Sequence, residues 1–507
     1  MIIGVDLGTS VTKASAIYFD GRVGETASMP TTLDRHPGGR VEQDFAGVLA
    51  SVAIVVRQIA TAAQAAGETI EAVAITGQGD GLWLRDAAGN PVRPAISWMD
   101  ARAAEIVESW NRPGDTGDAS ISRQVYRLTG SGLFPGCHAA LLAWLAANEP
   151  ESLEHAAVAG YCVDAVLHSL TGKITVDASD ASLPFMNVRT RTYVPEALEL
   201  CGIADWAHLL SQPAESGTIF SLDARGAALL ELPEGTPVTG GPYDLQACGL
   251  GSGTTRVGEG TLVVGTTLSC QVLTDDTTID PEVDPAGMWL CTADPDLFLR
   301  VMPSMVGTAS LDWLLGLFEL EAKELNGLLL QSPPGANGAS ALTFFSPSGE
   351  RAPFVEPFAR GEFTGLQLRN TRADLLRALC EGVAFAARHC FEEMGLDGEV
   401  AACGGGLQSD AWAGIFADVL GRPLYLPNDS AVGSRGAALT AWAGLGTPVD
   451  DDLWRSQRRR IDPNPERTAF YDRAYVGYRQ RLASARALWA LGRSGSAELS
   501  ASVGVNA

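Results

Sequence analysis

The chain has 507 residues, of which 46% are hydrophobic and 19% are charged. This composition is typical of a folded protein with enough apolar side chains for two or three domains. Thirty-six basic against 60 acidic side chains give a net charge of −24, which disfavours nucleic acids and anionic membranes as partners. A small anionic substrate is still admissible, because salt screens the net field within about 10 Å while local amides and a cation act directly.

The nine cysteines are scattered singly, without a CxxC pair. This pattern predicts reduced core thiols in a cytoplasmic protein. The N-terminus has no signal-peptide pattern, and no run of about 18 apolar residues stands out. We therefore expect neither secretion nor membrane insertion.

The first element is a hairpin over residues 2–13. Ile2 to Val5 is predicted to be a buried strand, and Gly8 lets the chain reverse with its amides pointing at an anion. Asp6, at the end of the strand, is suited to hold hydrated Mg²⁺ against phosphates. Further donors follow at Thr9, Ser10 and Lys13. An ordinary strand and turn with an acidic tip is the alternative interpretation of this segment.

An amphipathic helix over residues 45–66 and a strand over 72–76 precede a second polar turn. That turn carries Gly79 and Asp80, and Trp98 follows eighteen residues after Asp80. A carboxylate near a tryptophan suits a polyhydroxy ligand, because hydroxyls pair with the charge while C–H groups pack on the ring. A plain turn beside a buried tryptophan is the alternative.

Helices are predicted over residues 139–148 and 161–171, before the chain pauses at prolines and glycines near residues 236–242. Asp244 comes directly after this pause. Its carboxylate is a candidate acceptor for a hydroxyl proton, and an N-cap of a following helix is an equally weighted and compatible role.

A second strand, over residues 260–264, leads into a turn with hydroxyl side chains at Gly265, Thr266 and Thr267. This turn echoes the first hairpin without repeating its sequence. We expect two related halves that face one phosphate site.

A long helix is predicted over residues 371–395, and a closing helix over 468–493. Between them, a strand of small residues ends in Gly404, Gly405 and Gly406, followed by Gln408 and a helix start. Such a turn admits a flat ring against bare backbone, although a ligand-free strand-to-helix turn has the same pattern. No GxxxxGK[ST], GxGxxG or GxSxG motif and no metal-ligand spacing of histidines is present.

Together, these motifs resemble the FGGY carbohydrate kinases of the actin-like ATPase superfamily. The resemblance covers roughly residues 1–480, and its most specific stretch is Gly404 to Trp442, supported by Ser346 to Pro353. It implies an α/β fold of two ribonuclease-H-like domains around a central cleft. It also implies phosphorylation of a sugar or polyol hydroxyl with ATP and Mg²⁺ as cofactors, and a small sugar or polyol as the partner, with a homodimer as the expected assembly.

The resemblance also assigns roles by position. It implies Asp244 as the general base and Asp6 as the magnesium residue. Substrate contacts are implied for Gly79, Asp80, Trp98 and Asp244. Thr9, Ser10 and Lys13 match the first phosphate loop; Gly265, Thr266 and Thr267 match the second; Gly405, Gly406 and Gln408 match the adenosine site.

We expect an N-terminal domain over residues 1–240 with the sugar site and first phosphate loop. A C-terminal nucleotide-binding domain is expected over residues 241–493, and a disordered tail over 494–507.

One residue departs from the family pattern: Leu141 stands where the N-terminal signature usually has lysine. This departure and the Gly79-Asp80 pair make glycerol kinases and xylulokinases alternatives rather than the first choice. The string from Gly77 to Gly81 looks more like erythritol kinases and their relatives that act on pentitols, L-xylulose or keto-gulonate. An ATP-driven binding protein or chaperone on the same fold, or an inactive regulatory homologue, is a further alternative.

Overall fold

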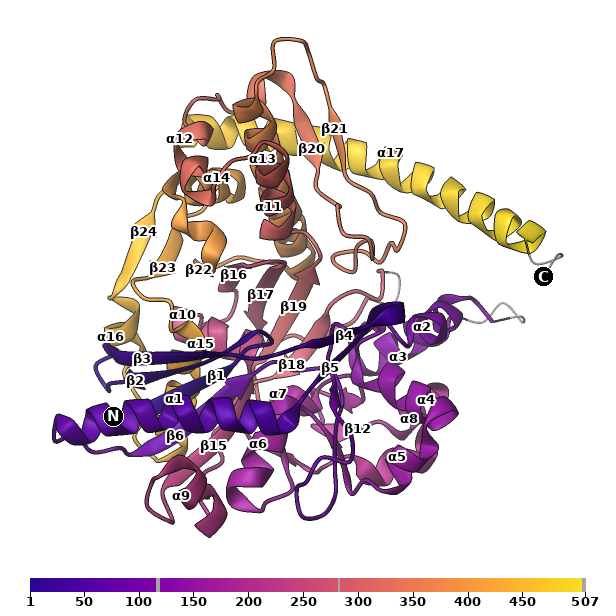
Figure 1. Cartoon of the computed structure of the whole chain (residues 1–507). Helices are drawn as coiled ribbons and strands as arrows, with labels where there is room; N and C mark the ends of the chain where they lie inside the picture. Colours follow the sequence, from indigo (N-terminus) through magenta and orange to yellow (C-terminus); the bar gives the residue numbers. More distant parts are fainter. Residues whose placement is uncertain (115–118, 281–282, 504–507) are drawn as a thin grey trace. The chain divides into compact units, whose positions relative to one another are not determined.

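The computed structural model describes residues 1–114, 119–280 and 283–503, with side chains described up to residue 489. The chain divides into two compact units (Figure 1). The first comprises Met1–Val257, Leu273–Arg300 and Asp429–Gln457, and the second comprises Gly258–Val272, Val301–Asn428 and Arg458–Ala507. Each unit is therefore assembled from segments that are distant in the sequence.

A six-stranded sheet of order β14-β15-β6-β1-β2-β3 forms the centre of the first unit. β1 pairs with β2 antiparallel and with β6 parallel, and β6 pairs with β15 parallel. The carboxyl ends of β1, β6 and β15 therefore meet at one edge of the sheet. The strands are β1 (Ile2–Leu7), β2 (Val11–Ile17), β3 (Val23–Pro30), β6 (Ala72–Gly77), β14 (Phe220–Ser221) and β15 (Pro237–Tyr243).

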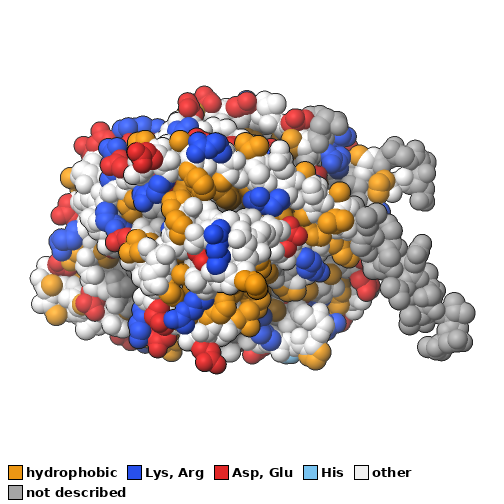
Figure 2. All heavy atoms as spheres, turned by 90° about the horizontal axis from the view of Figure 1, so that it is seen from above, with side chains coloured by type: hydrophobic (Ala, Val, Ile, Leu, Met, Phe, Trp, Pro, Cys, Tyr) orange, Lys and Arg blue, Asp and Glu red, His pale blue; other side chains and the backbone are white. Residues whose placement is uncertain are grey.

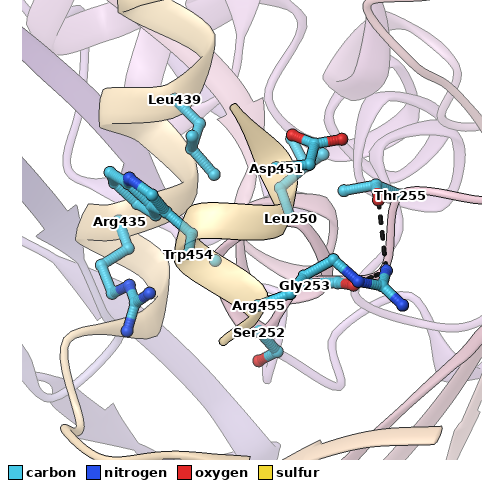
Figure 3. A pocket seen from close by; sticks show the side chains of 10 residues that line it. Leu250, Ser252, Gly253, Thr255, Arg435, Leu439, Asp451, Trp454 and Arg455 are labelled. Carbon is cyan, nitrogen blue, oxygen red and sulfur yellow. Dashed lines mark hydrogen bonds between the residues drawn. The ribbon is translucent and has the colours of Figure 1, made fainter. Parts of the chain in front are cut away.

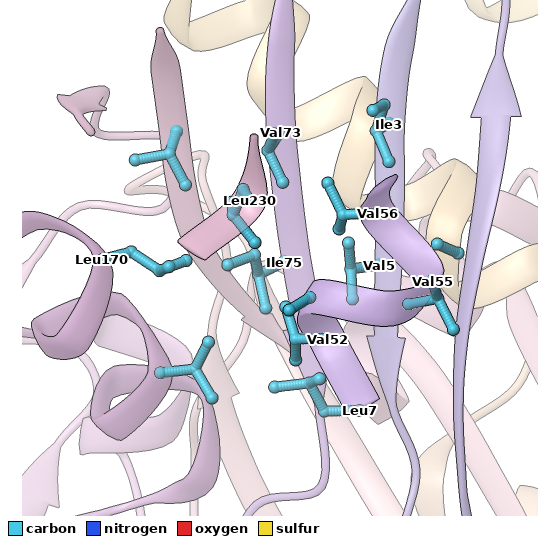
Figure 4. Packing of buried hydrophobic residues seen from close by; sticks show 14 of the residues in the cluster. Ile3, Val5, Leu7, Val52, Val55, Val56, Val73, Ile75, Leu170 and Leu230 are labelled. Atoms are coloured by element: carbon cyan, nitrogen blue, oxygen red, sulfur yellow. The ribbon is translucent and has the colours of Figure 1, made fainter. Parts of the chain in front are cut away.

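The two faces of this sheet are covered by different helices. Ile3, Val5 and Leu7 pack with one side of α1 (Phe45–Ala65) in a single buried cluster (Figure 4). Because side chains alternate along a strand, the residues between them point to the opposite face. There Ile2 packs with residues of α15 (Val432–Gly444), including Trp442. The same alternation directs Asp6 toward α15.

The remaining strands and helices of the first unit surround this sheet. Small sheets are formed by β4 (Asp34–His36), β5 (Arg40–Gln43) and β8 (Ala95–Ile96), by β7 (Trp83–Arg85) and β9 (Val158–Gly160), by β10 (Val176–Asp177) and β13 (Pro213–Ala214), and by β11 (Met186–Asn187) and β12 (Thr192–Tyr193). The other helices are α2 (Ala104–Asn111), α3 (Ile121–Thr129), α4 (His138–Asn148), α5 (Pro150–Glu154), α6 (Cys162–Thr171), α7 (Ala178–Ala181), α8 (Pro195–Leu200), α9 (Ala224–Leu230), α10 (Asp244–Ser252) and α16 (Asp451–Arg455).

The second unit repeats the central plan of the first. Strands in the order β19-β17-β16-β22-β23-β24 again combine an antiparallel hairpin, β16–β17, with two parallel neighbours, β22 and β23. β18 (Met288–Cys291) falls within the residues of the first unit. The strands are β16 (Gly260–Val264), β17 (Leu268–Thr274), β19 (Phe298–Ser304), β22 (Val400–Cys403), β23 (Leu424–Pro427) and β24 (Arg458–Ile461), with β20 (Ser340–Leu342) and β21 (Glu362–Thr364) paired separately. The helices are α11 (Thr308–Leu317), α12 (Leu325–Leu329), α13 (Arg372–Met394), α14 (Asp410–Leu420) and α17 (Pro465–Val503).

The C-terminal segment expected to be disordered, 494–507, lies partly within α17, which is assigned to Val503. Residues 504–507 lie outside the described residues, so the expectation for the tail stays a prediction. All nine cysteines fall in the described ranges, none of them in a disulfide, and eight are buried.

One described helix, α1, is long and apolar enough to cross a membrane by length and composition. Its apolar side packs on the central sheet, as expected for a core helix of a folded unit.

Candidate functional site

Three candidate residues of the first unit lie at the carboxyl ends of three neighbouring parallel strands. Asp6 is the next-to-last residue of β1, Asp80 follows β6, and Asp244 follows β15 directly. Strand register brings them to the same level, since Leu7 and Tyr243 both pair with Gly77. This edge is where ligands bind in open sheets with parallel strands. Residues more than 230 positions apart are thus collected at one place.

Asp6 lies on the α15 face of β1, against the first turn of that helix. A Cβ atom built on Gly433 would lie 2.6 Å from Asp6 Oδ2, so the carboxylate rests on bare backbone. Burial raises the Asp6 pKa to about 6, and the charge of Lys13, its partner across the β1–β2 hairpin, opposes this rise. A carboxylate in this setting is stabilised by a nearby cation.

Asp244 is the first residue of α10, whose N-cap residue is Tyr243. The N-cap role considered for Asp244 is therefore wrong by one position. The backbone before it is held by hydrogen bonds: Thr76 Oγ1 donates to the Pro242 carbonyl at 2.5 Å, and the Tyr243 amide donates to Ser179 Oγ at 2.8 Å. Burial, followed by the Asp6 and Asp80 carboxylates, raises the Asp244 pKa well above its usual value.

The Gly79–Gly81 turn is shaped by close contacts. A Cβ on Gly79 would lie 2.4 Å from the Tyr243 ring and 2.8 Å from Asp180 Oδ1. Asp80 has φ of 52° and Gly81 has φ of 70°, a left-handed pair that most side chains avoid. Only glycine fits at position 79, where the backbone lies against the ring of Tyr243, the residue that precedes Asp244.

The phosphate-loop candidates and the substrate candidates meet at one side chain. Trp98 Nε1 donates to Thr9 Oγ1 at 2.9 Å, and Thr9 Oγ1 donates to Gln78 Oε1 at 3.1 Å. Ser10 and Lys13 are exposed, as side chains that contact a ligand phosphate need to be. Within the first unit, the structure thus brings the substrate candidate Trp98 into contact with the phosphate-loop candidate Thr9.

Two sets of polar residues in this unit were not predicted from the sequence. One is the glutamine pair Gln43 and Gln78, both buried. The other is a set of buried acids from α6, β10 and α7, of which the last approaches Gly79: Asp164, Asp177 and Asp180. A glycine at position 79 was the available signal, because a missing side chain beside polar residues marks a close approach by another group.

Asp180 stands out among these acids. It is 1% exposed, and its Oδ1 has no hydrogen-bond partner, whereas Asp164 pairs with Arg85. Burial, together with the Asp177, Asp164, Asp244 and Asp80 carboxylates, raises the Asp180 pKa well above its usual value.

Asp180→Asn is expected to change the pH dependence of stability. The folded-state pKa of Asp180 exceeds the unfolded value. Above about pH 4, the folded protein therefore keeps a proton on Asp180 that the unfolded chain loses. Its free energy of unfolding then falls with rising pH, by at most about 1.4 kcal/mol per pH unit for this one group. Thermal unfolding at pH 4.5 and pH 8 should show the variant gaining stability relative to wild type at pH 8. Asp86→Asn is the control with the opposite sign, since hydrogen bonds from Asn90 lower the Asp86 pKa.

In the second unit, the other two predicted motifs meet at the start of α11. The Thr308 amide donates to the Gly265 carbonyl at 2.9 Å, and the Ala309 amide donates to the Thr266 carbonyl at 3.2 Å. A Cβ on Gly406 would lie 2.5 Å from Val264 Cγ1 and 3.1 Å from Thr308 Cγ2. The β16–β17 turn, which ends at Thr267, and the glycine turn are therefore packed around one helix start.

The three glycines of that turn differ in their surroundings. Gly404 has φ of 110° and lies against the Val264 backbone, whereas a Cβ on Gly405 would meet nothing within 4 Å. Gly405 and Gln408 are exposed and Gly406 is buried. Gly404 and Gly406 thus build the turn, and Gly405 presents open backbone.

A narrow cavity in the first unit lies away from the candidate residues. It is lined mainly by α10, α15 and α16, including Arg435, Trp454 and Arg455 (Figure 3). Its volume of about 10 Å³ is close to that of one water site, so it is too small for a sugar or a nucleotide.

On the face drawn in Figure 2, acidic and basic side chains are interspersed, without a continuous basic patch among the described residues.

Comparison with known proteins places these features in a family. The model of the FGGY family of carbohydrate kinases, N-terminal domain, matches residues 1–251, and the C-terminal domain model matches residues 260–445. The chain belongs to the FGGY family of carbohydrate kinases. It is a kinase with the two-domain α/β fold of this family, which confirms the fold class and the enzyme class expected from the sequence.

Among curated relatives, erythritol kinase of Brucella abortus is 30% identical, over 96% of this chain and 97% of its own length. L-xylulose/3-keto-L-gulonate kinase of Escherichia coli is 29% identical, over 95% and 96%. Among solved structures, a xylulose kinase from Rhodospirillum rubrum has a TM-score of 0.83 at 29% identity, covering 96% of this chain and 99% of that one. A glycerol kinase of Plasmodium falciparum, solved with ADP, shares the fold with a TM-score of 0.81 at 18% identity, covering 95% and 97%.

As an FGGY carbohydrate kinase, the protein uses ATP and a small sugar or polyol. The expected FGGY resemblance is confirmed, and the alternative of an ATP-driven binding protein without a sugar acceptor is not needed. Among the described residues, no group of three or more histidine, cysteine, aspartate or glutamate side chains is arranged to hold a metal ion.

Proposed function

We propose that this kinase transfers the γ-phosphoryl group of ATP to a hydroxyl of a four- or five-carbon polyol or ketose, of the erythritol or L-xylulose class. The observation that carries the proposal is the meeting of Asp244, Asp80 and Trp98 with the Thr9 turn in one unit. The relatives named for erythritol and for L-xylulose span nearly the whole chain, which supports this substrate class.

In this proposal, Asp244 is the general base. As the acceptor oxygen attacks the γ-phosphorus, its proton passes to the Asp244 carboxylate, and the bond between the γ-phosphorus and the bridging oxygen of ADP breaks. A pKa raised above the usual carboxyl range suits this role, because a more basic carboxylate takes a proton more readily. Asp80 and Trp98 would orient the acceptor, by a hydroxyl hydrogen bond and by ring packing.

The donor set fits Mg²⁺ bound together with nucleotide. Mg²⁺ is commonly held by one or two carboxylates plus substrate phosphates and water, and Asp6 offers such a carboxylate. When bound, Mg²⁺ would neutralise charge on the phosphates. Thr9, Ser10 and Lys13 in the first unit, and Gly265, Thr266 and Thr267 in the second, would supply phosphate contacts, and Gly405, Gly406 and Gln408 would line the adenosine site.

The sequence also supports three further assignments that we keep as proposals. These are a cytoplasmic location, a homodimeric assembly, and the absence of nucleic-acid and membrane partners. The domain limits 1–240 and 241–493 are likewise proposals.

The proposed function is tested by ADP release with ATP, Mg²⁺ and a panel of acceptors. The panel contains tetritols, pentitols, ketopentoses, glycerol and keto-gulonate. A strong signal that depends on erythritol, a pentitol or L-xylulose is expected. A dominant signal with D-xylulose or glycerol would instead favour the xylulokinase or glycerol kinase alternative. ATP hydrolysis that ignores every acceptor would contradict the proposal.

Gly405→Ala is expected to weaken nucleotide use without harming the fold. An added methyl meets nothing within 4 Å at this position, so the melting temperature should stay within about 1 °C of wild type. If a purine packs on this backbone, the methyl should raise the KM for ATP about three- to ten-fold, by analogy with other small steric changes in pockets. The KM for the acceptor should not change. An unchanged KM for ATP would remove Gly405 from the adenosine site.

A further inference from the structure

A closed ring of hydrogen bonds surrounds the turn of the first hairpin. Thr9 Oγ1 donates to Gln78 Oε1 at 3.1 Å, Gln78 Nε2 donates to Gln43 Oε1 at 3.0 Å, and Gln43 Nε2 returns to the Thr9 carbonyl at 3.4 Å. Gln43 is 1% exposed and Gln78 is 4% exposed. We call this group, Thr9, Gln43 and Gln78, the Thr9 ring. It joins the β1–β2 turn to the ends of β5 and β6.

The direction of each hydrogen bond in the ring is determined by the others. A hydroxyl has one proton and an amide has one donor end and one acceptor end. Turning either amide over would place like atoms against each other, so the ring has one consistent arrangement. The single proton of the Thr9 hydroxyl is therefore directed at Gln78.

A fourth residue donates a hydrogen bond to the oxygen of this hydroxyl. Trp98 Nε1 donates to Thr9 Oγ1 at 2.9 Å, so the oxygen both gives and accepts a hydrogen bond inside the protein. In this arrangement the hydroxyl has no proton to offer to a phosphate. Both partners of the hydroxyl belong to segments that carry the proposed acceptor contacts: Gln78 precedes Gly79 and Asp80, and Trp98 is itself one of them.

We propose that the Thr9 ring makes ATP use depend on the acceptor. Resting on the proposed function, the inference is that a polyol bound at Trp98 and Asp80 displaces the partners of Thr9, after which its hydroxyl is free to donate to the transferring phosphate. Gln43 and Gln78 are positioning residues in this device. Since coupling between two ligands is reciprocal, bound acceptor should tighten ATP and bound ATP should tighten the acceptor.

The test is ATP hydrolysis without acceptor, in Gln78→Met and in Gln43→Met. Gln78→Met removes the group that accepts the Thr9 hydroxyl proton, and Gln43→Met removes the bond that holds the Gln78 amide in place. Both keep a side chain of similar bulk, so a folding failure of one leaves the other usable. Releasing the Thr9 hydroxyl should raise acceptor-free hydrolysis about three- to ten-fold, the factor that one net hydrogen bond supplies. Ser51→Ala is the matched control. It removes another buried hydrogen bond to the same hairpin, between Ser51 Oγ and Thr12 Oγ1 at 2.7 Å, and should leave acceptor-free hydrolysis unchanged.

A second readout separates positioning from a purely structural role. Wild type should show a lower KM for ATP at saturating acceptor than at low acceptor, and Gln43→Met should lose most of this difference. If Gln43→Met and Ser51→Ala both lower only the melting temperature, the ring is structural and the inference is overturned. Failure of the proposed function is recognised separately, because wild type would then phosphorylate no member of the acceptor panel.

Discussion

Asp244→Asn is expected to lower the turnover number by about 10²–10⁴-fold, the range for loss of a general base. The amide has nearly the shape of the carboxylate but cannot take the proton of the acceptor hydroxyl. The substitution also removes a negative charge near Asp6, since the Asp6 carboxylate acts on that of Asp244. ADP affinity, measured by calorimetry, should therefore stay within a few-fold of wild type or improve.

Asp180→Asn is the matched control for this prediction. It removes a carboxylate from the same acidic neighbourhood without removing the proposed base, so its turnover number should fall by much less than that of Asp244→Asn. Equal losses in the two variants would mean that the summed charge of the acids, rather than a proton acceptor at position 244, is what turnover requires.

Gly433→Ala should lower the turnover number about 10- to 100-fold by moving Asp6, because misplacing a reacting group by about 1 Å has effects of this size. The added methyl would lie 2.6 Å from Asp6 Oδ2 and 3.0 Å from Cγ, well inside ordinary contact distance. Alanine in a helix is otherwise favoured over glycine by about 0.5–1 kcal/mol. The variant should need a higher Mg²⁺ concentration for half-maximal rate than wild type, while its melting temperature stays near that of wild type.

Gly316→Ala supplies the control for that variant. Gly316 lies in α11, and an added Cβ meets nothing within 4 Å there. Unchanged kinetics are expected, with a small gain in stability from the helix preference alone. If Gly433→Ala also keeps wild-type kinetics, the contact between α15 and Asp6 has no part in the reaction.

The local elements were predictable from the sequence because their patterns are short in range. The helix expected over residues 45–66 is α1, Phe45–Ala65, and the strand expected over 260–264 is β16. The helix start expected after Gln408 is α14, Asp410–Leu420, and its N-cap Ser409 accepts from the Trp412 amide. In each case the signal is periodicity or a single capping residue within one turn.

The parts of the site that depend on distant partners were not predictable in this way. Gln43 and Gln78 lie 35 positions apart, and nothing in either local sequence indicates that their amides meet. Asp180 acquires its setting from Gly79 and Tyr243, which only the folded chain brings to it. Polar residues buried through such contacts have no periodic signature, so sequence reasoning found Asp6, Asp80 and Asp244 but not the residues around them.

The segment Asp429–Gln457 has a consequence for how this protein is made. It supplies α15, whose Ala437, Ala441 and Trp442 cover Ile2 and Ala72 of the first sheet. During synthesis from the N-terminus, α15 cannot cover this face of the sheet until nearly nine-tenths of the chain has left the ribosome. Glycine at position 4 lets α15 pack closely on this face, since a Cβ there would lie 2.4 Å from the Ser434 carbonyl oxygen. A nascent chain that stops before residue 429 would carry an apolar sheet face open to chaperones and to aggregation.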